Sequence, residues 1–594
     1  MEDDLPTEYD VIVVGTGMTE SIVAAAASRI GKKVLHLDSN EYYGGLWATF
    51  NFDGLQKWIE DLKLSKNATK DVSGIELQSD EKFLKASDQY STVENIEETW
   101  YISNEADLPL LSSKDTQTDC SGEGSGSGDE KTDEDKVDKK ENVKHWSIDR
   151  IRKEYRKFNI DLAPKLLFAR GELVELLISS NISRYAEFRS VSRVATFMDG
   201  RLTQVPCSRT DVFANKTVSL VEKRMLMKLL TSCMVQGADS PEFDGFQEKT
   251  FLEYLETKSL TPIVQHYIVQ AIAMATEKTS CRDGVNRTKH FLNSLGRYGN
   301  TPFLWPMYGS GELPQCFCRL CAVFGGVYCL KRQLDGVVID NEKCKAIISG
   351  KQRLTLEHLV VGQGHLPPEI VASEGEQRIS RGVFITDRSI MQGEKENLTL
   401  LYYPPEEPGQ EPVTLIELGP STNACPQGLF MVHMTCKRTA NAKEDLAYVV
   451  NKFLRAETFD PLANRASIHS HTQTVSPDKR HLQENDKEES AENIKPQVLW
   501  SLYLNLPASD IKLNDSAPSN LHLCSGPDLE LDFDFAVNQA MSIFKAMYPD
   551  EEFLPRAPDP EEIVLDDEEE PGPKFEGDIE AEEKQDVEKA EKEE

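Results

Sequence analysis

Hydrophobic residues along the first forty positions recur with the periods of a strand, a helix and a second strand. Residues 9–14 form an apolar run that predicts a short buried strand, and the Ala-rich residues 21–29 predict a helix. Residues 33–37 repeat the strand pattern and end at Asp38, while Gly15-Thr16-Gly17 supplies a tight turn after the first strand. These segments predict one βαβ unit, and therefore an α/β fold.

The pattern becomes helical in the middle of the chain and then returns to strands. Helices are expected at about 211–236, 249–276 and 286–296, and alternation from 326 to about 361 predicts strands of a mixed sheet. This order indicates a small all-helical domain inserted into a large, discontinuous α/β domain. We expect the helical domain at 206–292 and the large domain at 1–103, 145–205 and 293–560.

Three polar tracts interrupt these patterns. Residues 104–144 are acidic and rich in Gly and Ser, and they predict a disordered insertion. Residues 464–494 predict a polar loop insertion. Residues 561–594 carry 17 acidic and 4 basic residues, a net charge of −13, and predict a disordered acidic tail with a solubilising role.

Overall charge limits what the chain can bind. Its 66 Lys and Arg residues against 100 Asp and Glu give a net charge of −34, which opposes binding to nucleic acid. No run of about 18 uncharged apolar residues appears, and the acidic start differs from the basic start of a signal peptide, so we expect a cytosolic protein. Twelve Cys residues at low density favour reduced thiols. Cys316, Cys318 and Cys321 are interpreted as core residues, and no metal is expected.

The glycine turn has the context of a dinucleotide-binding loop. Gly15 and Gly17 follow a strand and open a helix, Asp38 ends the next strand where a ribose-binding carboxylate would stand, and Gly44-Gly45 follows. This spacing resembles the glutathione-reductase-like (FAD/NAD(P)-binding-like) flavoprotein class. The third glycine of the loop, however, is replaced by Glu20.

We expect this loop to be a vestige without a bound cofactor. The carboxylate of Glu20 would repel a phosphate by roughly 4 kcal/mol at about 4 Å and an effective dielectric of about 20. Late in the chain, Pro527 removes a backbone donor at the expected second flavin-binding turn. Both residues oppose binding of flavin or nicotinamide.

Seven motifs closely resemble the Rab GDP-dissociation-inhibitor and Rab escort protein family. They are DVIVVGTGMTESI at 10–22, KKVLHLD at 32–38, YYGG at 42–45, FNIDL at 158–162, SRYAEF at 183–188, GRYGNTPF at 296–303 and MYGSGELPQ at 307–315. The length of the chain, the insertion at 104–144, VPCSR at 205–209 and CFCR at 316–319 are similar to the escort branch.

The resemblance implies a cofactor-free, non-catalytic protein. It would bind newly made, GDP-bound Rab GTPases, present them to the α/β heterodimer of Rab geranylgeranyltransferase, shield the geranylgeranyl lipid and deliver prenylated Rab to membranes. A GDP-dissociation inhibitor that recycles prenylated Rabs is the alternative of the same class. A flavin amine oxidase is the alternative of another class, favoured by the βαβ unit and Asp38 and opposed by Glu20 and Pro527.

The resemblance also implies a Rab-binding platform on the large domain. Matching motif by motif places it at Tyr43, Glu312, Arg319, Val327 and Cys329. A carboxylate, a guanidinium and an aromatic ring around an apolar centre suit a protein interface. From the residues alone, Tyr43 is also explained as a packing residue, and Glu312 as a capping residue of a helix that begins near Leu313.

In the helical domain, the resemblance implies that Phe213 and Arg224 bind the transferase. The nearby Met225, Met227 and Leu230 are candidates for the prenyl-lipid pocket, because flexible Met side chains suit a cavity that opens. From the residues alone, Phe213 is also explained as a core residue and Arg224 as part of a solvated helix face. The Met and Leu residues are then ordinary core residues.

Overall fold

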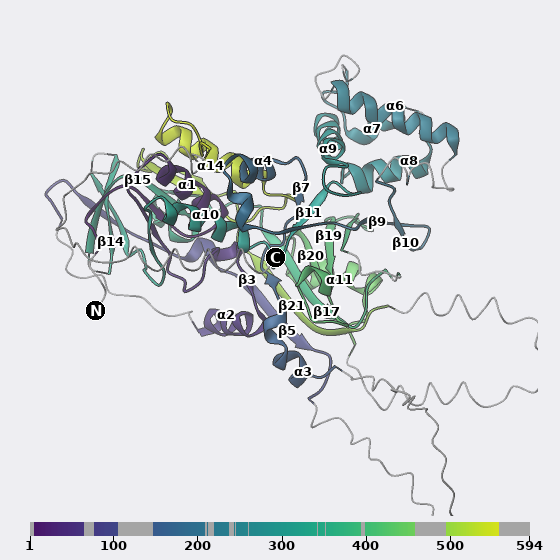
Figure 1. Ribbon diagram of the computed structural model, residues 1–594, viewed down its shortest axis with the longest axis horizontal. Helices are drawn as coiled ribbons and strands as arrows, with labels where there is room; N and C mark the ends of the chain where they lie inside the picture. Colours follow the sequence, from purple (N-terminus) through teal and green to yellow (C-terminus); the bar gives the residue numbers. More distant parts are fainter. Residues whose placement is uncertain are drawn as a thin grey trace, which may run out of the picture. The chain divides into compact units, whose positions relative to one another are not determined.

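A sheet with a parallel centre carries the glycine loop in the computed structural model (Figure 1). Its parallel strands are, in spatial order, β12 (Val327–Cys329), β2 (Val34–Leu37), β1 (Glu8–Val14), β15 (Gln352–Gly362) and β23 (Leu521–Cys524). An antiparallel extension continues from the first half of β15 through β14 (Lys343–Ser349), β13 (Gly336–Asp340) and β4 (Lys82–Lys85). The central strands are buried on both faces, as in α/β folds.

Helices cover one face of this sheet. They are α1 (Met18–Arg29), α4 (Glu172–Ser179), α10 (Glu312–Val323) and α14 (Asp534–Met547). They share one hydrophobic cluster with the strand residues Val11 and Val13, whereas Ile12 and Val14 point to the opposite face. The predicted βαβ unit, β1-α1-β2, is confirmed, with the helix three residues longer at its start.

A second, mostly antiparallel sheet follows. Its order is β10 (Arg201–Gln204), β9 (Arg193–Met198), β18 (Thr399–Tyr403), β19 (Val413–Leu418), β20 (Phe430–Lys437), β17 (Ile379–Thr386), β21 (Val498–Leu506) and β5 (Glu94–Trp100). Side chains alternate between two clusters: Val383 and Ile385 enter the largest core, and Phe384 packs with α11 (Ala442–Phe453).

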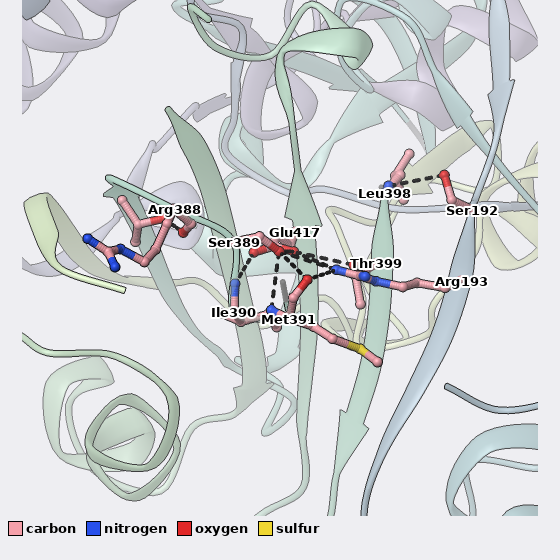
Figure 2. Close-up of polar contacts among 10 residues, drawn as sticks. Ser192, Arg193, Arg388, Ser389, Ile390, Met391, Leu398, Thr399 and Glu417 are labelled. Atoms are coloured by element: carbon pink, nitrogen blue, oxygen red, sulfur yellow. Dashed lines mark hydrogen bonds and ion pairs between the residues drawn. The ribbon is translucent and has the colours of Figure 1, made fainter. Parts of the chain in front are cut away.

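A buried ion pair joins β9 to β19 in this second sheet (Figure 2). Arg193 Nη2 lies 3.6 Å from Glu417 Oε2, and Arg193 Nε donates to Thr399 Oγ1 at 2.7 Å. The Ile390 backbone N–H donates to Glu417 Oε1 at 2.6 Å. Glu417 is fully buried, so the pair and its hydrogen bonds hold the loop after β17 against the sheet.

A helical insertion lies between β10 and β11 (Phe303–Pro306). It contains α6 (Leu220–Gln236), α7 (Phe251–Glu256), α8 (Pro262–Tyr267), a π-helical turn (Ile268–Ile272) and α9 (Cys281–Ser294). The helix expected at 249–276 is therefore broken, because Thr261 precedes α8 and Pro262 occupies its first turn, where proline begins helices. A Cβ at Gly284 would lie 2.1 Å from the Phe251 ring, so close packing of α9 on α7 requires glycine there.

Shorter elements complete the fold. They are β3 (Thr49–Phe50) with β6 (Ile160–Asp161), β7 (Leu167–Phe168) and β8 (Phe188–Ser190) with β11, β16 (Val371–Ser373) with β22 (Lys512–Leu513), α2 (Phe52–Leu64) and α3 (Ile148–Lys153). Within the described residues, none of the helices has the length and apolar character that a bilayer crossing requires.

The structure describes residues 5–64, 77–104, 146–207, 211, 219–236, 243, 245–258, 260–340, 342–350, 352–391, 393, 398–457 and 495–556. The predicted polar loop at 464–494 and the acidic tail at 561–594 lie outside this set, as does the predicted insertion at 104–144 apart from Asn104.

Candidate functional site

Helix α10 has one buried and one exposed face. Leu313, Phe317 and Leu320, at helical spacing, pack into the cluster shared with α1. Arg319 and Val323 are exposed on the other side, and Val323 is 63% exposed. The exposed face of α10 is therefore available to a partner.

The start of α10 does not use the Glu312 side chain as a cap. The Ser310 backbone N–H donates to Asp161 Oδ1 at 2.9 Å, and the Gly311 N–H donates to Thr49 Oγ1 at 2.8 Å, so side chains from β3 and β6 satisfy these donors. The Glu312 side chain forms no hydrogen bond or ion pair with any described residue, and desolvation raises the pKa of its half-buried carboxyl. This geometry does not support Glu312 as the cap of α10.

Arg319 lies on the same side of α10, seven residues or about two turns after Glu312. Its guanidinium stacks over the Tyr185 ring, 4.4 Å from the ring centroid, and pairs with no carboxylate among the described residues. Tyr185 is itself 40% exposed. The stacking holds an unneutralised cation at the surface.

Tyr43 lies beside the same helix. Its ring is 6.1 Å from the Tyr328 ring, edge to face, and burial together with the neighbouring Cys318 raises the pKa of its hydroxyl. The Tyr328 hydroxyl in turn lies 2.7 Å from His36 Nδ1, within the parallel sheet. Tyr43 is therefore half-buried in an aromatic contact and presents only part of its surface.

Strand β12 carries two residues of the predicted platform, and their side chains point away from α10. Val327 and Cys329 pack with the cluster on the sheet face opposite α10, whereas Tyr328 packs on the α10 side. Tyr328 therefore has its side chain beside Tyr43, whereas those of Val327 and Cys329 lie on the other face, and their place in the platform stays a prediction. The cause is the two-residue alternation of a strand, which the sequence could have indicated. Among the described strands, β12 is the end strand of its sheet, so its outer backbone edge pairs with no other described strand.

The three cysteines of α10 are buried, as expected of core residues. Cys316 and Cys321 belong to the α1–α10 cluster, and Cys318 Sγ lies 3.3 Å from Ser21 Oγ of α1. Burial raises the pKa of the Cys316 thiol to about 11. These thiols stay protonated near neutral pH and are unsuited to nucleophilic roles.

Arg224 and the predicted lipid residues lie on α6. Arg224 is exposed, Met225 and Leu230 are half-buried against the core of the insertion, and Met227 is also half-buried. Phe213 lies outside the described residues. The structure thus places Arg224 at the surface and its apolar neighbours within one helix turn or two of it.

Glu20 fills the space that the glycine loop would offer a phosphate. A Cβ at Gly17 would lie 2.5 Å from Glu20 Oε2, one at Gly362 would lie 2.5 Å from Oε1, and one at Gly15 would lie 3.3 Å from Oε1. The carboxyl thus occupies the position among three glycines at the start of α1. A cavity of about 950 Å³ adjoins it and is also lined by Asp38 and Pro527.

The expected electrostatic repulsion needs correction. Burial raises the pKa of Glu20 to about 8, and Oε2 has no hydrogen-bond partner among the described residues. The group is therefore largely neutral at pH 7. Glu20 blocks the phosphate position by its volume rather than by its charge.

Other groups that a dinucleotide would use are already hydrogen-bonded. Asp38 Oδ2 accepts from the Thr16 N–H at 2.9 Å, and its Oδ1 accepts from the Asn40 N–H at 2.8 Å. In the turn before Pro527, the Gly526 N–H donates to Gln363 Oε1 at 3.1 Å. A flavin or nicotinamide dinucleotide does not fit these residues.

Comparisons with known proteins agree with the motifs. The family model described as "GDP dissociation inhibitor" matches residues 5–103 and 139–460. "Rab proteins geranylgeranyltransferase component A 1" of Homo sapiens is 39% identical over 95% of this chain and 94% of that protein. The Drosophila melanogaster "Rab proteins geranylgeranyltransferase component A" is 38% identical over 96% of this chain and 94% of that protein.

A solved structure supports the fold. Rab GDI from Plasmodium falciparum superimposes with a TM-score of 0.54 at 16% identity, covering 92% of this chain and 99% of that one. Together with the two sheets and their helices, this likeness confirms the predicted α/β fold class.

Proposed function

Because this chain belongs to the GDP dissociation inhibitor family, we propose that it acts as a Rab escort protein. The observation that carries the proposal is the match of about 38–39% identity, over almost the whole chain, to proteins named component A of Rab geranylgeranyltransferase. In this role the protein binds GDP-loaded Rab and presents it to the transferase. It does not itself catalyse prenyl transfer, and it works in the cytosol.

The Rab-binding surface is the exposed side of α10 with Tyr43 and the outer edge of β12. Glu312 and Arg319 support this assignment because each is a charged group without a charged partner in the described chain. A Rab surface that offers one cation and one anion about two helix turns apart would satisfy both. Val323 adds exposed apolar area beside them.

The helical insertion carries the transferase contact and the lipid site. Arg224, exposed on α6, and Phe213 contact the transferase, and the prenyl chain enters beside Met225, Met227 and Leu230. Each buried methylene contributes about 0.8 kcal/mol, so a twenty-carbon chain is held strongly and needs a release step at the membrane.

A GDP-dissociation inhibitor is the second candidate, favoured by the description of the family model and by the fold of the solved relative. Such a protein would extract prenylated Rab from membranes without recruiting the transferase. Binding to the transferase therefore distinguishes the two functions.

The α10 surface is tested by the affinity of GDP-loaded, unprenylated Rab for three variants. Arg319→Ala and Glu312→Ala are expected to weaken binding at least tenfold, because each removes a charged contact at the centre of the interface. Arg388→Ala, in the loop after β17, is the matched control and should leave the affinity unchanged, since Arg388 pairs with its neighbour Asp387. Unchanged affinity in both α10 variants would refute the assignment.

A further inference from the structure

Three side chains with metal-binding chemistry meet at the contact between the helical insertion and the parallel-sheet domain. His290 belongs to α9, and Asp532 and Asp534 stand at the start of α14. One ligand atom from each lies within 4.8 Å of the other two. None of these residues belongs to the α10 surface or to the glycine loop.

The imidazole of His290 faces the two carboxylates at a distance too long for hydrogen bonds. Its Nε2 lies 3.9 Å from Asp532 Oδ2 and 3.7 Å from Asp534 Oδ2. The Nε2 atom is buried and has no hydrogen-bond partner among the described residues. A buried polar atom in this state costs about 1–3 kcal/mol, so a group between the three would stabilise it.

The surrounding contacts orient all three side chains. Asp532 Oδ1 accepts from the Asp534 N–H at 3.0 Å, and Asp534 Oδ1 accepts from the Glu172 N–H at 3.0 Å. The Leu173 backbone N–H also bonds to Asp534, and the Oδ2 atom of each carboxylate is the one that faces His290. The Phe168 ring packs edge to face on the imidazole at a centroid distance of 4.0 Å. This is the support that surrounding residues give to metal ligands.

The local charge also favours a cation. The charge of Glu172 acts on both His290 and Asp534, and that of Asp528 acts on Asp532. The ammonium of nearby Lys165 is hydrogen-bonded to Asp528 and to the Glu530 carbonyl, and its charge also acts on Asp532. The carboxylates around the gap therefore outnumber the cations.

We propose that His290, Asp532 and Asp534 bind one zinc ion. In a tetrahedral site with ligand bonds of about 2.1 Å, ligand atoms lie about 3.4 Å apart. The gaps of 3.7 and 3.9 Å therefore need to close by only a few tenths of an ångström to hold an ion. One imidazole nitrogen with two carboxylate oxygens favours zinc over magnesium, and water completes the tetrahedron. The ion would join α9 to α14 and fix the insertion on the large domain.

The test is zinc binding by the full-length protein after treatment with a chelator, measured by competition with a chromophoric chelator. Wild type is expected to bind one equivalent that weakens at least tenfold in His290→Ala and Asp532→Asn. The Asn side chain keeps the acceptor for the Asp534 N–H, so this variant preserves the fold. His266→Ala is the control, because His266 lies on α8 outside the cluster and its Nε2 contacts Thr196 Oγ1 of β9.

Two readouts separate this site from zinc bound elsewhere on the chain. Zinc should raise the melting temperature of wild type and His266→Ala but not of the two site variants. Cobalt should give the intense visible bands of a tetrahedral site in wild type, and these bands should vanish in Asp532→Asn. Equal stoichiometry, affinity and cobalt spectra in wild type and both site variants would overturn the proposal.

Discussion

Replacing Glu20 by Gln should remove a pH-dependent instability built into the glycine loop. Burial raises the pKa of Glu20 from 4.5 to about 8, so between these values the folded protein keeps a proton that the unfolded chain releases. The unfolded state then binds fewer protons, and the free energy of unfolding falls as pH rises from about 4.5 to 8. At about 1.4 kcal/mol per pKa unit, the loss reaches roughly 5 kcal/mol above pH 8.

The assay is urea unfolding of wild type and Glu20→Gln at pH 5 and pH 8.5. The variant should be within about 1 kcal/mol of wild type at pH 5 and several kcal/mol more stable at pH 8.5. An infrared difference spectrum at pH 7 should also show a protonated carboxyl that is absent from the variant. Glu41→Gln is the control and should gain nothing at pH 8.5, because Glu41 is exposed and pairs with Lys57 and Lys331. Parallel pH profiles for wild type and Glu20→Gln would refute the reasoning.

Three further predictions follow from the buried network, the insertion and the blocked loop. Glu417→Gln should lower the free energy of unfolding by about 3 kcal/mol, because it leaves Arg193 buried without its counter-ion. Lys452→Ala, which breaks an exposed ion pair, should lower it by under about 1 kcal/mol. Equal losses of stability for the two variants in a urea titration would contradict this prediction. Arg224→Ala should weaken transferase binding at least fivefold in a pull-down titration and leave Rab affinity unchanged, and equal loss of both would indicate an unfolded insertion instead. Purified protein should show no flavin absorbance near neutral pH, and a stoichiometric flavin spectrum would disprove the block at Glu20.

Local patterns predicted the βαβ unit well because its signals are short-range. An apolar run, a glycine turn and an Ala-rich stretch each act within a few residues, and β1, α1 and β2 follow them. The broken helix at 249–276 follows the same rule, since the local signal of Pro262 begins a new helix within the long helix that the apolar spacing predicts.

The candidate surface needed the fold before it could be judged. The sequence motifs predicted Tyr43, Glu312 and Arg319 as surface residues. Only the packing of α10 shows that the Glu312 side chain does not cap the helix and that Arg319 stacks on Tyr185. The orientation of Val327 depends on which sheet face α10 covers, which is a tertiary fact.

The charge state of Glu20 was also beyond the sequence. The sequence predicts an ionised carboxylate, whereas burial of the Glu20 carboxyl among three glycines favours the neutral acid. The His290 cluster was beyond the sequence for a similar reason, because His290 lies more than 240 positions before Asp532 and Asp534 and meets them only in the folded protein.

The most direct test of the escort function is a reconstituted prenylation assay. GDP-loaded Rab, purified Rab geranylgeranyltransferase and geranylgeranyl pyrophosphate are mixed with and without this protein, and lipid incorporation into Rab is measured. The account predicts incorporation only when the protein is present. No incorporation, together with intact extraction of prenylated Rab from membranes, would contradict the escort function and identify a GDP-dissociation inhibitor instead.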